Sequence, residues 1–206
     1  MLKMAIFGSG SGSNAQAIID AIEAGQLNAQ VTCILSDEKE AFILERARKH
    51  NIPDFYIDCA PFRTKLDGDA EQRVLEILEQ NEVNLVVLAG FMRIVKKGLL
   101  EKYKGHIINI HPSLLPSFPG LEAGRQAFEY GVRFTGCTVH FVDEGVDTGA
   151  IITQRCVEIT PDDTPESLMQ KIHKQEHIAY PKALQWLAEG RIQRKNRRIQ
   201  IIPPAQ

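Results

Sequence analysis

A short apolar segment carries two residues that could act on a carbonyl group. The segment is Ile107–Ile110, and Asn109 and His111 stand two positions apart, just before Pro112. Side chains two apart in a strand point to the same face, and proline does not continue a central ladder, so we expect the pair at the carboxyl end of a strand. An amide beside an imidazole can stabilise negative charge that develops on a carbonyl oxygen. A lone histidine is more often structural, but the neighbouring amide and the Pro-rich loop at 113–120 favour a functional role.

An acidic loop, Asp143–Gly149, joins two later apolar segments and carries Asp143, Glu144 and Asp147. Such loops are usually solvated turns. If this loop reaches the sheet edge that carries His111, one carboxylate could orient the imidazole and accept a proton from a nucleophile. The sequence spacing leaves that contact open.

A glycine-serine loop, Gly8–Asn14, lies between the first apolar segment and an amphipathic one. Exposed amides and the helix dipole at such a position favour an anion, and this loop favours a monophosphate. The dinucleotide pattern G-x-G-x-x-G fails at its third glycine, where Ser13 stands, although Asp37 after the second strand keeps that alternative open. A Walker loop is excluded because no Lys-Ser/Thr follows. A flexible turn without a ligand is the remaining alternative.

The elements that would position these residues alternate between strands and helices. We expect strands at Leu2–Phe7, Val31–Leu35, Phe55–Ile57, Leu85–Ala89, Ile107–Ile110, Thr135–Phe141 and Ala150–Val157. We expect helices at Ala15–Ala24, Ala41–His50, Ala70–Gln80 and Leu121–Tyr130, and a long one from Pro165 to about Glu189. This order predicts an α/β fold with a Rossmann-like, mostly parallel open sheet flanked by helices. A basic segment after it predicts a solvated terminal hairpin around Lys195 and Asn196.

The composition excludes several classes of protein. With 206 residues, of which 44% are hydrophobic and 24% charged, the chain can bury a sizeable core and is neither disordered nor of low complexity. A net charge of −2 argues against a nucleic-acid-binding surface. No apolar run is long enough to cross a bilayer and no signal-type segment precedes the first strand, so we expect a cytoplasmic protein. The four cysteines form no CxxC pair, and we expect them buried and reduced.

One motif suggests a metal but is weak. His173, Glu176 and His177 match the inverted zinc-protease pattern H-x-x-E-H. A match this short arises easily by chance, and only Glu189 follows as a later carboxylate ligand. We therefore expect no metal.

Several motifs together carry a resemblance to a known family. In chain order they are Gly12-Ser-Asn14, Leu88-Ala-Gly-Phe-Met-Arg93, Asn109-Ile-His-Pro-Ser-Leu-Leu-Pro116, Gly136-Cys-Thr-Val-His140, Asp147-Thr-Gly149, and Gln175-Glu-His177 with Tyr180-Pro181. Over nearly its whole length the chain resembles the phosphoribosylglycinamide formyltransferases, a folate-dependent branch of the formyltransferase family. This resemblance implies transfer of a formyl group from 10-formyltetrahydrofolate to the amine of glycinamide ribonucleotide in purine (IMP) biosynthesis.

The resemblance also implies roles for individual residues. The catalytic residues would be Asn109, His111 and Asp147. The ribonucleotide would be bound by Gly12, Ser13, Asn14, Gly90 and Glu176, with either Lys65 or Arg63 as a basic contact to the phosphate, of which we choose Lys65. The folate would be bound by Met92, Arg93, Ile94, Val95, Val139, His140, Val142, Asp143 and Asp147.

The same resemblance bounds the organisation and the partners. Residues 1–206 would form a single formyltransferase domain, with a nucleotide-binding half at about 1–100 and a folate-binding half at 101–206. The partners would be the two small substrates, with no nucleic acid and no membrane, and a homodimer is one assembly that the resemblance allows.

Four alternatives stay open on the sequence. A hydrolase of formyltetrahydrofolate would share the catalytic trio but normally has a further domain in front. A tRNA formyltransferase normally has a further C-terminal domain and lacks the Gly-Ser-Asn loop. The glycine loop alone would also suit a nicotinamide-dependent oxidoreductase or a non-catalytic nucleotide-binding module.

Overall fold

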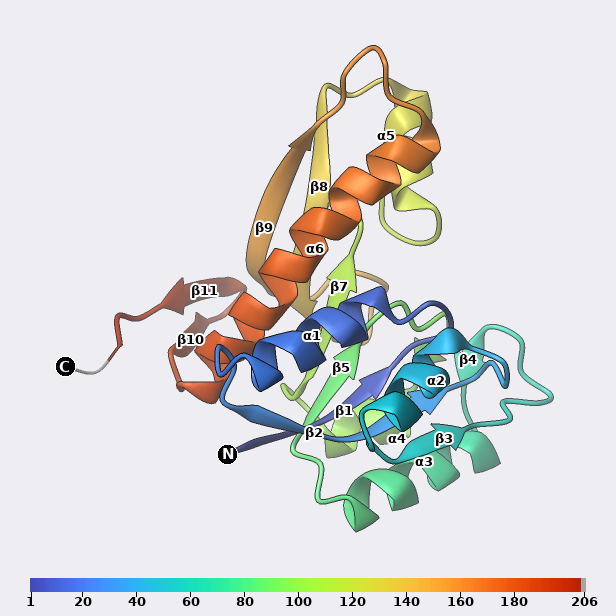
Figure 1. The fold of residues 1–206 in the computed structure, drawn as a ribbon. Coiled ribbons are helices and arrows are strands. Elements are labelled where there is room, and N and C mark those ends of the chain that lie inside the picture. The colour runs from blue at the N-terminus through green and yellow to red at the C-terminus, as the bar shows by residue number, and fades with distance from the viewer. Residues whose placement is uncertain (205–206) are drawn as a thin grey trace.

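The computed structural model describes residues 1–204, and one seven-stranded sheet runs through them (Figure 1). Its strands are β1 Leu2–Phe7, β2 Ala29–Ser36, β3 Asp54–Tyr56, β5 Leu85–Leu88, β7 Ile107–His111, β8 Phe134–Phe141 and β9 Ile151–Glu158. The order in the sheet is β3-β2-β1-β5-β7-β8-β9. The first five strands are parallel, whereas β8 and β9 are antiparallel to their neighbours. The predicted mostly parallel α/β sheet is confirmed.

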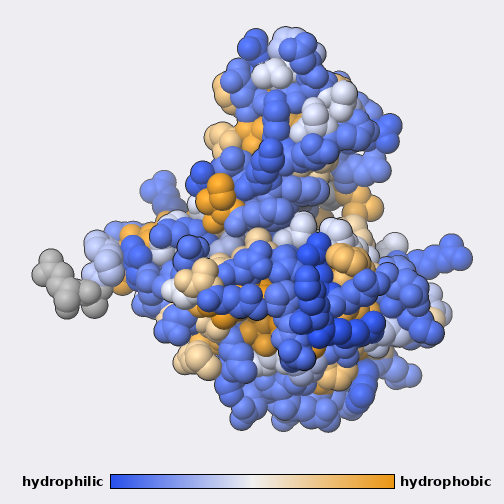
Figure 2. Space-filling view, viewed as in Figure 1, coloured by the Kyte–Doolittle hydropathy of each residue, from blue (hydrophilic) through white to orange (hydrophobic). Residues whose placement is uncertain are grey.

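Helices cover both faces of the sheet. They are α1 Ser13–Glu23, α2 Phe42–Lys49, α3 Asp69–Gln80, α4 Lys97–Lys102, α5 Ala123–Tyr130 and α6 Pro165–Ala188. Alternate residues of β1 divide the core: Met4 and Ile6 pack with α1, α2 and α6, whereas Ala5 and Phe7 pack with α3 and α4. A parallel strand buried on both faces needs such a continuous apolar run. The outer surface on the side of α1 and α6 is mostly hydrophilic (Figure 2), as expected for amphipathic helices.

The strand order reverses between β1 and β5. The chain builds β2 and β3 on one side of β1, and then β5 and β7 on the other side. Open α/β sheets bind ligands at such a switch point, outside the carboxyl ends of the strands. The two loops that follow β1 and β5 meet there, because the Ser9 amide donates to the Gly90 carbonyl at 3.0 Å.

Three small elements were not expected from the sequence. They are α4 and a two-stranded parallel sheet that pairs β4, Lys65–Leu66, with β6, Ile94–Val95. Two-residue strands are too short to show a period, which explains why the pattern did not reveal them. The expected terminal hairpin is present as β10, Ile192–Lys195, and β11, Arg198–Ile201, with Asn196 at φ 57° in its turn.

Helix α6 connects the antiparallel strands β8 and β9 with helix α1. A capping box starts it, in which the Thr164 side chain accepts from the Ser167 amide and the Ser167 side chain accepts from the Thr164 amide. The helix contacts α1, α5, β8 and β9 (Figure 1). Its fully buried Tyr180 hydroxyl donates to the carbonyls of Leu88 at 2.9 Å and Ile108 at 3.1 Å. Burial raises the pKa of Tyr180 well above its usual value, so the hydroxyl stays a donor.

The cysteines differ in part from the expectation. All four are free; Cys33, Cys59 and Cys137 are buried, but Cys156 is exposed. Cys156 lies on β9, whose middle residues face solvent because this strand is at the edge of the sheet. Burial raises the pKa of the Cys33 and Cys137 thiols to about 12, so these two are unreactive at neutral pH. No helix within residues 1–204 is long and apolar enough to span a membrane.

We expect Tyr180→Phe to destabilise the protein by about 1–3 kcal/mol, because two buried carbonyl groups lose a donor. Thermal unfolding should show a fall in Tm of roughly 2–4 °C per kcal/mol for a chain of this size. The matched control is Tyr130→Phe, since Tyr130 is 79% exposed and its hydroxyl is not needed for packing. Equal Tm values for the two variants would contradict a structural role for the Tyr180 hydroxyl.

Candidate active site

A cavity of about 450 Å³ lies at the switch point, a volume suited to small-molecule ligands. Its walls come from the loops after β1, β5 and β7, from the loop between β8 and β9, and from one side of α6. The lining includes Gly12, Ser13, Asn14, Gly90, Met92, Arg93, Ile94, Val95, Asn109, His111, His140, Val142, Asp143, Asp147 and Glu176. Residues predicted from five separate parts of the sequence thus share one cavity.

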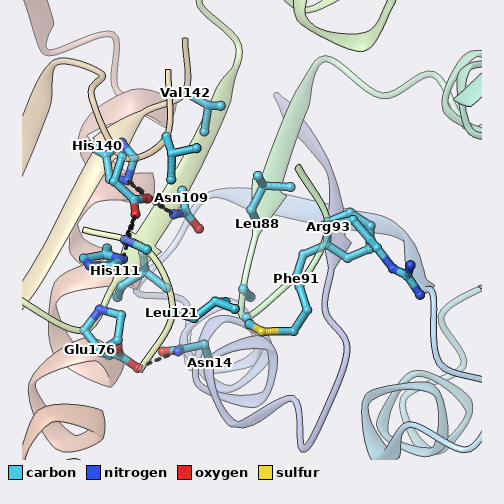
Figure 3. Close-up of a pocket in the computed structure, with 18 of the residues that line it drawn as sticks. Asn14, Leu88, Phe91, Arg93, Asn109, His111, Leu121, His140, Val142 and Glu176 are labelled. Atoms are coloured by element: carbon cyan, nitrogen blue, oxygen red, sulfur yellow. Dashed lines mark hydrogen bonds and ion pairs between the residues drawn. The ribbon is translucent and has the colours of Figure 1, made fainter. Parts of the chain in front are cut away.

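Asn109 and His111 lie at the carboxyl end of β7, as predicted. Strand β7 is central: Asn109 pairs with Leu88 of β5 on one side and with His140 of β8 on the other. The alternation of the strand directs both side chains into the cavity (Figure 3). His111 is 4% exposed, so its ring is held among protein groups rather than water.

The acidic loop contacts Asn109 and His111, and this contact could not be predicted from the sequence spacing. The Asp147 Oδ2 atom is 3.3 Å from His111 Nδ1 and accepts from the Gly120 amide at 2.8 Å. Its Oδ1 atom is 3.6 Å from His140 Nε2 and 3.5 Å from Asn109 Nδ2. One carboxylate therefore contacts both residues of the predicted pair and a second histidine.

The turn that presents Asp147 is strained and tightly packed. Asp147 has φ 55°, a left-handed conformation that aspartate adopts more readily than most residues. A Cβ atom at Gly149 would lie 1.6 Å from the Phe141 carbonyl oxygen. Only glycine fits there, which fixes the approach of the loop to β8.

The surroundings of Asp147 favour its charged form. Burial by itself raises the pKa of a carboxyl group, but the hydrogen bonds from His140 and the Gly120 amide, and the charge of His111, outweigh it. The net result is a pKa below the usual 3.8. On its other side His111 has Nε2 at 2.8 Å from the Phe118 carbonyl, so each ring nitrogen faces an oxygen acceptor. This arrangement suits an imidazolium, which has two donors.

The glycine-serine loop forms the opposite end of the cavity. Gly12 has φ 69° and begins α1 without a side-chain cap, so the first amides of the helix stay available to a ligand. A Cβ atom on Gly12 would lie 2.7 Å from Ile43 Cγ1, and the left-handed φ would strain it as well. Helix α2 holds the loop from behind: the Ile43 amide donates to the Gly10 carbonyl at 3.1 Å and Arg46 Nε to the Ser11 carbonyl at 2.8 Å.

Glu176 brings α6 to this loop. Its Oε2 atom accepts from Asn14 Nδ2 at 2.8 Å, and the two residues are 3% and 8% exposed (Figure 3). Burial raises the pKa of Glu176 above its usual 4.5. The Asn14 Oδ1 atom is buried and has no partner among residues 1–204. A buried acceptor of this kind is costly unless a ligand supplies a donor.

The loop after β5 presents apolar side chains to the cavity, whereas the guanidinium of Arg93 points elsewhere. Met92 and Ile94 are 56% and 46% exposed at the mouth of the cavity. The guanidinium of Arg93 points away from His111 and Asn14 (Figure 3), and it donates to Asp37 and to the Phe62 carbonyl. The hydrogen bond to Asp37 raises the pKa of Arg93 further above its usual value, so the guanidinium stays charged.

Two of the predicted ligand contacts do not line the cavity. Val139 is completely buried in the core, because it alternates with His140 along β8 and so faces the other side of the sheet. Lys65 lies in β4, where its Nζ pairs with Asp67 and stacks on the Phe62 ring at 4.1 Å. Arg63, the alternative to Lys65, lines a separate hollow with Arg93 and Asp37.

Some contributors to the site were missed by sequence reasoning. His140 was expected only to contact the folate, and its position beside Asp147 depends on the register of β7 and β8. The Gly120 amide and the Phe118 carbonyl are backbone groups, which residue types do not reveal. Asp37 was considered only for a dinucleotide, although its place directly after β2 was a usable signal.

The side chains of the H-x-x-E-H pattern do not converge on one point. The His173 and His177 rings stack with centroids 6.4 Å apart, while Glu176 turns to Asn14. Burial lowers the pKa of His177 below its usual 6.5. Within residues 1–204 no group of three or more His, Cys, Asp or Glu is arranged to hold a metal ion.

Comparison with known proteins gives consistent matches. The family model described as formyl transferase matches residues 2–184. The chain is 45% identical over 187 residues to phosphoribosylglycinamide formyltransferase of Bacillus subtilis, covering 91% of this chain and 95% of that protein. It is 46% identical to trifunctional purine biosynthetic protein adenosine-3 of Drosophila melanogaster, spanning 91% of this chain but 14% of that protein. The crystal structure of glycinamide ribonucleotide transformylase 1 from Symbiobacterium toebii superposes with a TM-score of 0.94 at 43% identity, covering 98% and 95% of the two chains.

We expect Glu176→Gln to stabilise the protein at neutral pH. The folded-state pKa of Glu176 lies above the unfolded value, so wild type loses stability as pH rises through the interval between the two values, and the loss persists above it. Glutamine keeps an acceptor for Asn14 but has no charge to bury. Urea unfolding at a series of pH values should show a difference that is smallest below pH 4.5 and grows with pH.

The control for this measurement is Glu40→Gln, because Glu40 is exposed. A pH-independent difference between Glu176→Gln and wild type, or the same pH trend in Glu40→Gln, would show that burial of the Glu176 charge is not the cause.

Proposed function

The chain belongs to the formyl transferase family, and we propose that it transfers the formyl group of 10-formyltetrahydrofolate to the amine of N1-(5-phosphoribosyl)glycinamide. The products are the N-formyl ribonucleotide and tetrahydrofolate, a step of purine biosynthesis. One observation carries the proposal: the Asn109, His111 and Asp147 cluster shares a cavity with an anion-binding helix start and a buried glutamate. This arrangement joins carbonyl chemistry to a phosphorylated sugar.

The reaction is a direct acyl transfer. The amine nitrogen attacks the formyl carbon, a new C–N bond forms, and the carbonyl oxygen becomes negatively charged. Collapse of this intermediate breaks the bond from the carbon to N10 of the folate. One proton leaves the attacking amine and one reaches the leaving nitrogen, so the step needs an oxyanion donor and a proton carrier but no covalent enzyme intermediate.

We assign the oxyanion to Asn109 and His111. The Asn109 Nδ2 atom has two N–H bonds and lies 3.5 Å from Asp147 Oδ1 and 3.3 Å from His140 Nε2, so one N–H can hold Asp147 while the other exchanges His140 for the formyl oxygen. The positive charge of a protonated His111 ring, sustained by Asp147 3.3 Å away, stabilises the same oxygen. Donation from His111 Nε2 requires that its bond to the Phe118 carbonyl be exchanged for the substrate.

We assign the proton transfer to Asp147. Its lowered pKa keeps it ionised at neutral pH, and it can accept a proton from the amine directly or through a water molecule. Its fixed bond to the Gly120 amide holds one oxygen in place, and the second oxygen faces Asn109 and His140. His140, 3.6 Å away, adds a second donor that keeps the carboxylate charged.

We place the ribonucleotide at the α1 end of the cavity. The amides at Gly12, Ser13 and Asn14 suit a phosphate dianion by hydrogen bonding and by the helix dipole. Glu176 accepts from the sugar hydroxyls, and a ligand donor satisfies the unpaired Asn14 Oδ1. Gly90 lines the cavity between this end and the catalytic cluster.

We place the folate between the loop after β5 and the acidic loop. Met92, Ile94 and Val95 supply apolar contacts, and Val142 and Asp143 close the other side. Residues 1–206 act as one domain in this proposal, and the cavity draws on both halves of the chain. A cytoplasmic location follows from the proposed pathway, and the homodimer stays a prediction that analytical ultracentrifugation can test.

The proposal predicts that formyl release depends on the ribonucleotide amine. Purified protein with 10-formyltetrahydrofolate should produce tetrahydrofolate, followed by absorbance, only when glycinamide ribonucleotide is present. An equal rate with water alone would identify a hydrolase. Binding of NADPH with no binding of the folate would favour an oxidoreductase, and binding of the ribonucleotide with no turnover would favour a non-catalytic module.

We expect Asp147→Asn to lower kcat by roughly 10²–10⁴-fold, because the amide keeps the size of the side chain but cannot accept a proton. The bond to the Gly120 amide can persist through the amide oxygen, so the fold should be retained, which circular dichroism checks. Asp162→Asn is the control, since Asp162 is exposed on a distant turn. Near-normal kcat in Asp147→Asn would remove Asp147 from the proton-transfer role.

A further inference from the structure

Asp37 joins two loops that are far apart in sequence. It follows β2 directly and is 5% exposed, with the carboxylate itself almost completely covered. Its Oδ1 atom accepts from the Ser9 hydroxyl, and its Oδ2 atom accepts from Arg93 Nε. The two oxygens of one buried carboxylate therefore hold the loop after β1 and the loop after β5.

The connection between the two loops is reinforced by backbone groups. Ser9 Oγ also accepts from the Met92 amide at 2.8 Å, and the Ser9 amide donates to the Gly90 carbonyl at 3.0 Å. Arg93 Nη1 donates to the Phe62 carbonyl at 2.7 Å, which adds the loop before β4. Ser9, Asp37 and Arg93 thus form one continuous chain of contacts between the loops.

Ser9 and Asp37 do not line the ligand cavity, whereas Met92 and Arg93 do. Within the glycine-serine loop, the lining of the cavity starts at Gly10, one residue after Ser9. Asp37 does not line the cavity either, although it lines the separate hollow beside Arg93. A substitution of Ser9 or Asp37 thus changes how the loops after β1 and β5 are held together, without removing a group that lines the cavity.

We propose that Asp37 is a positioning residue that couples the two substrate sites, so that order imposed on one loop by its ligand is transmitted to the other. The inference rests on the proposed function, which places the ribonucleotide phosphate on the loop after β1 and the folate on the loop after β5. A phosphate bound at Gly12–Asn14 immobilises Ser9, and through Asp37 it fixes Met92 and Arg93. By linkage the folate must strengthen ribonucleotide binding by the same factor.

The charge of Asp37 is needed for this role. Arg93 is 14% exposed at its side chain, and its Nε has the Asp37 carboxylate as its partner. Asparagine keeps the size but has no charge to pair with the Arg93 guanidinium, and it has one acceptor oxygen in place of two, so the Ser9 hydroxyl and Arg93 Nε can no longer both donate to separate oxygens. Asp37→Asn therefore weakens the connection while leaving the residues that line the cavity in place.

The test measures coupling rather than activity alone. Isothermal titration calorimetry gives the Kd of tetrahydrofolate with and without saturating glycinamide ribonucleotide. In wild type the ribonucleotide should lower this Kd by a factor in the range of roughly 5–150. In Asp37→Asn and in Ser9→Ala the factor should fall towards one, and KM for both substrates should rise more than kcat falls.

The matched control is Asp54→Asn. Asp54 also forms an ion pair with an arginine, Arg48 at 2.7 Å, but it lies at the start of β3. This variant should keep the wild-type coupling factor. Ser9→Ala retains the Asp37–Arg93 pair, so it provides the test if Asp37→Asn does not fold.

The outcomes separate this inference from the proposed function. Wild-type protein that binds neither ligand would contradict the proposed function. Wild type that binds both ligands with a factor of one, or a Ser9→Ala variant that keeps the full wild-type factor, would overturn the coupling role alone. Loss of coupling in Asp54→Asn as well would show that any lost ion pair has this effect and would equally overturn it.

Discussion

The proposed active site depends on one buried carboxylate being held in its ionised form. Taking the charge of Asp147 out of water is unfavourable, and the protein offsets this cost with the Gly120 amide, the Asn109 amide and two histidines. Three of these partners, Gly120, Asn109 and His111, precede Asp147 by 27 or more positions, and His140 lies on the strand just before the loop. Their convergence requires that β7 and β8 pair in one register, and that the turn before Gly149 approach β8 closely. The pairing of the strands in the sheet therefore determines which groups surround the Asp147 carboxylate.

The sheet alone does not complete the site, because the parallel strands supply only one wall. Helix α6 supplies another, and its capping box and its Tyr180 hydroxyl fix its position over the ends of β5 and β7. One turn before Tyr180 on the same helix, Glu176 reaches Asn14 of α1. The contact that anchors the helix thus also determines where the buried glutamate meets the glycine-serine loop. Stability and substrate recognition share one element here.

Features with a short period or a local motif could be predicted from the sequence. The seven main strands, the strand-end pair Asn109 and His111, and the anion loop all follow from residues close together in the chain. Contacts across many residues could not. Asp147 lies 38 positions from Asn109, and nothing in the acidic loop tells which of its carboxylates faces inward. Val139 alternates with His140 along β8, so the strand pattern alone places the two side chains on opposite faces of the sheet. The resemblance implied folate contact for both residues because it applies to the whole segment and not to single positions.

Side-chain direction was the second limit. Arg93 belongs to a motif that implied folate contact, and its backbone does line the cavity, but a buried acid after β2 competes for its guanidinium. An ion pair with a fixed carboxylate that is already desolvated is favoured over an exposed position, because the Asp37 charge would otherwise stay unpaired. Residue type gives the chemistry available at a position, whereas burial of the partners decides whether that chemistry faces the ligand.

Two carboxylates of the cavity, Glu176 and Asp147, show how the same side-chain chemistry is given two different environments. Glu176 has little to offset its burial beyond the Asn14 amide, and its pKa rises, while Asp147 is surrounded by donors and its pKa falls. A positive charge on His111 acts to lower the pKa of both groups. Where the surroundings shift the pKa values of two acids in opposite directions, the acids are suited to different roles. The group that stays charged can take a proton, and the group that resists charging is suited to hydrogen bonding with a sugar. In the proposed mechanism both acids therefore depend on the same histidine, and loss of a charge on His111 would alter substrate binding and proton transfer together.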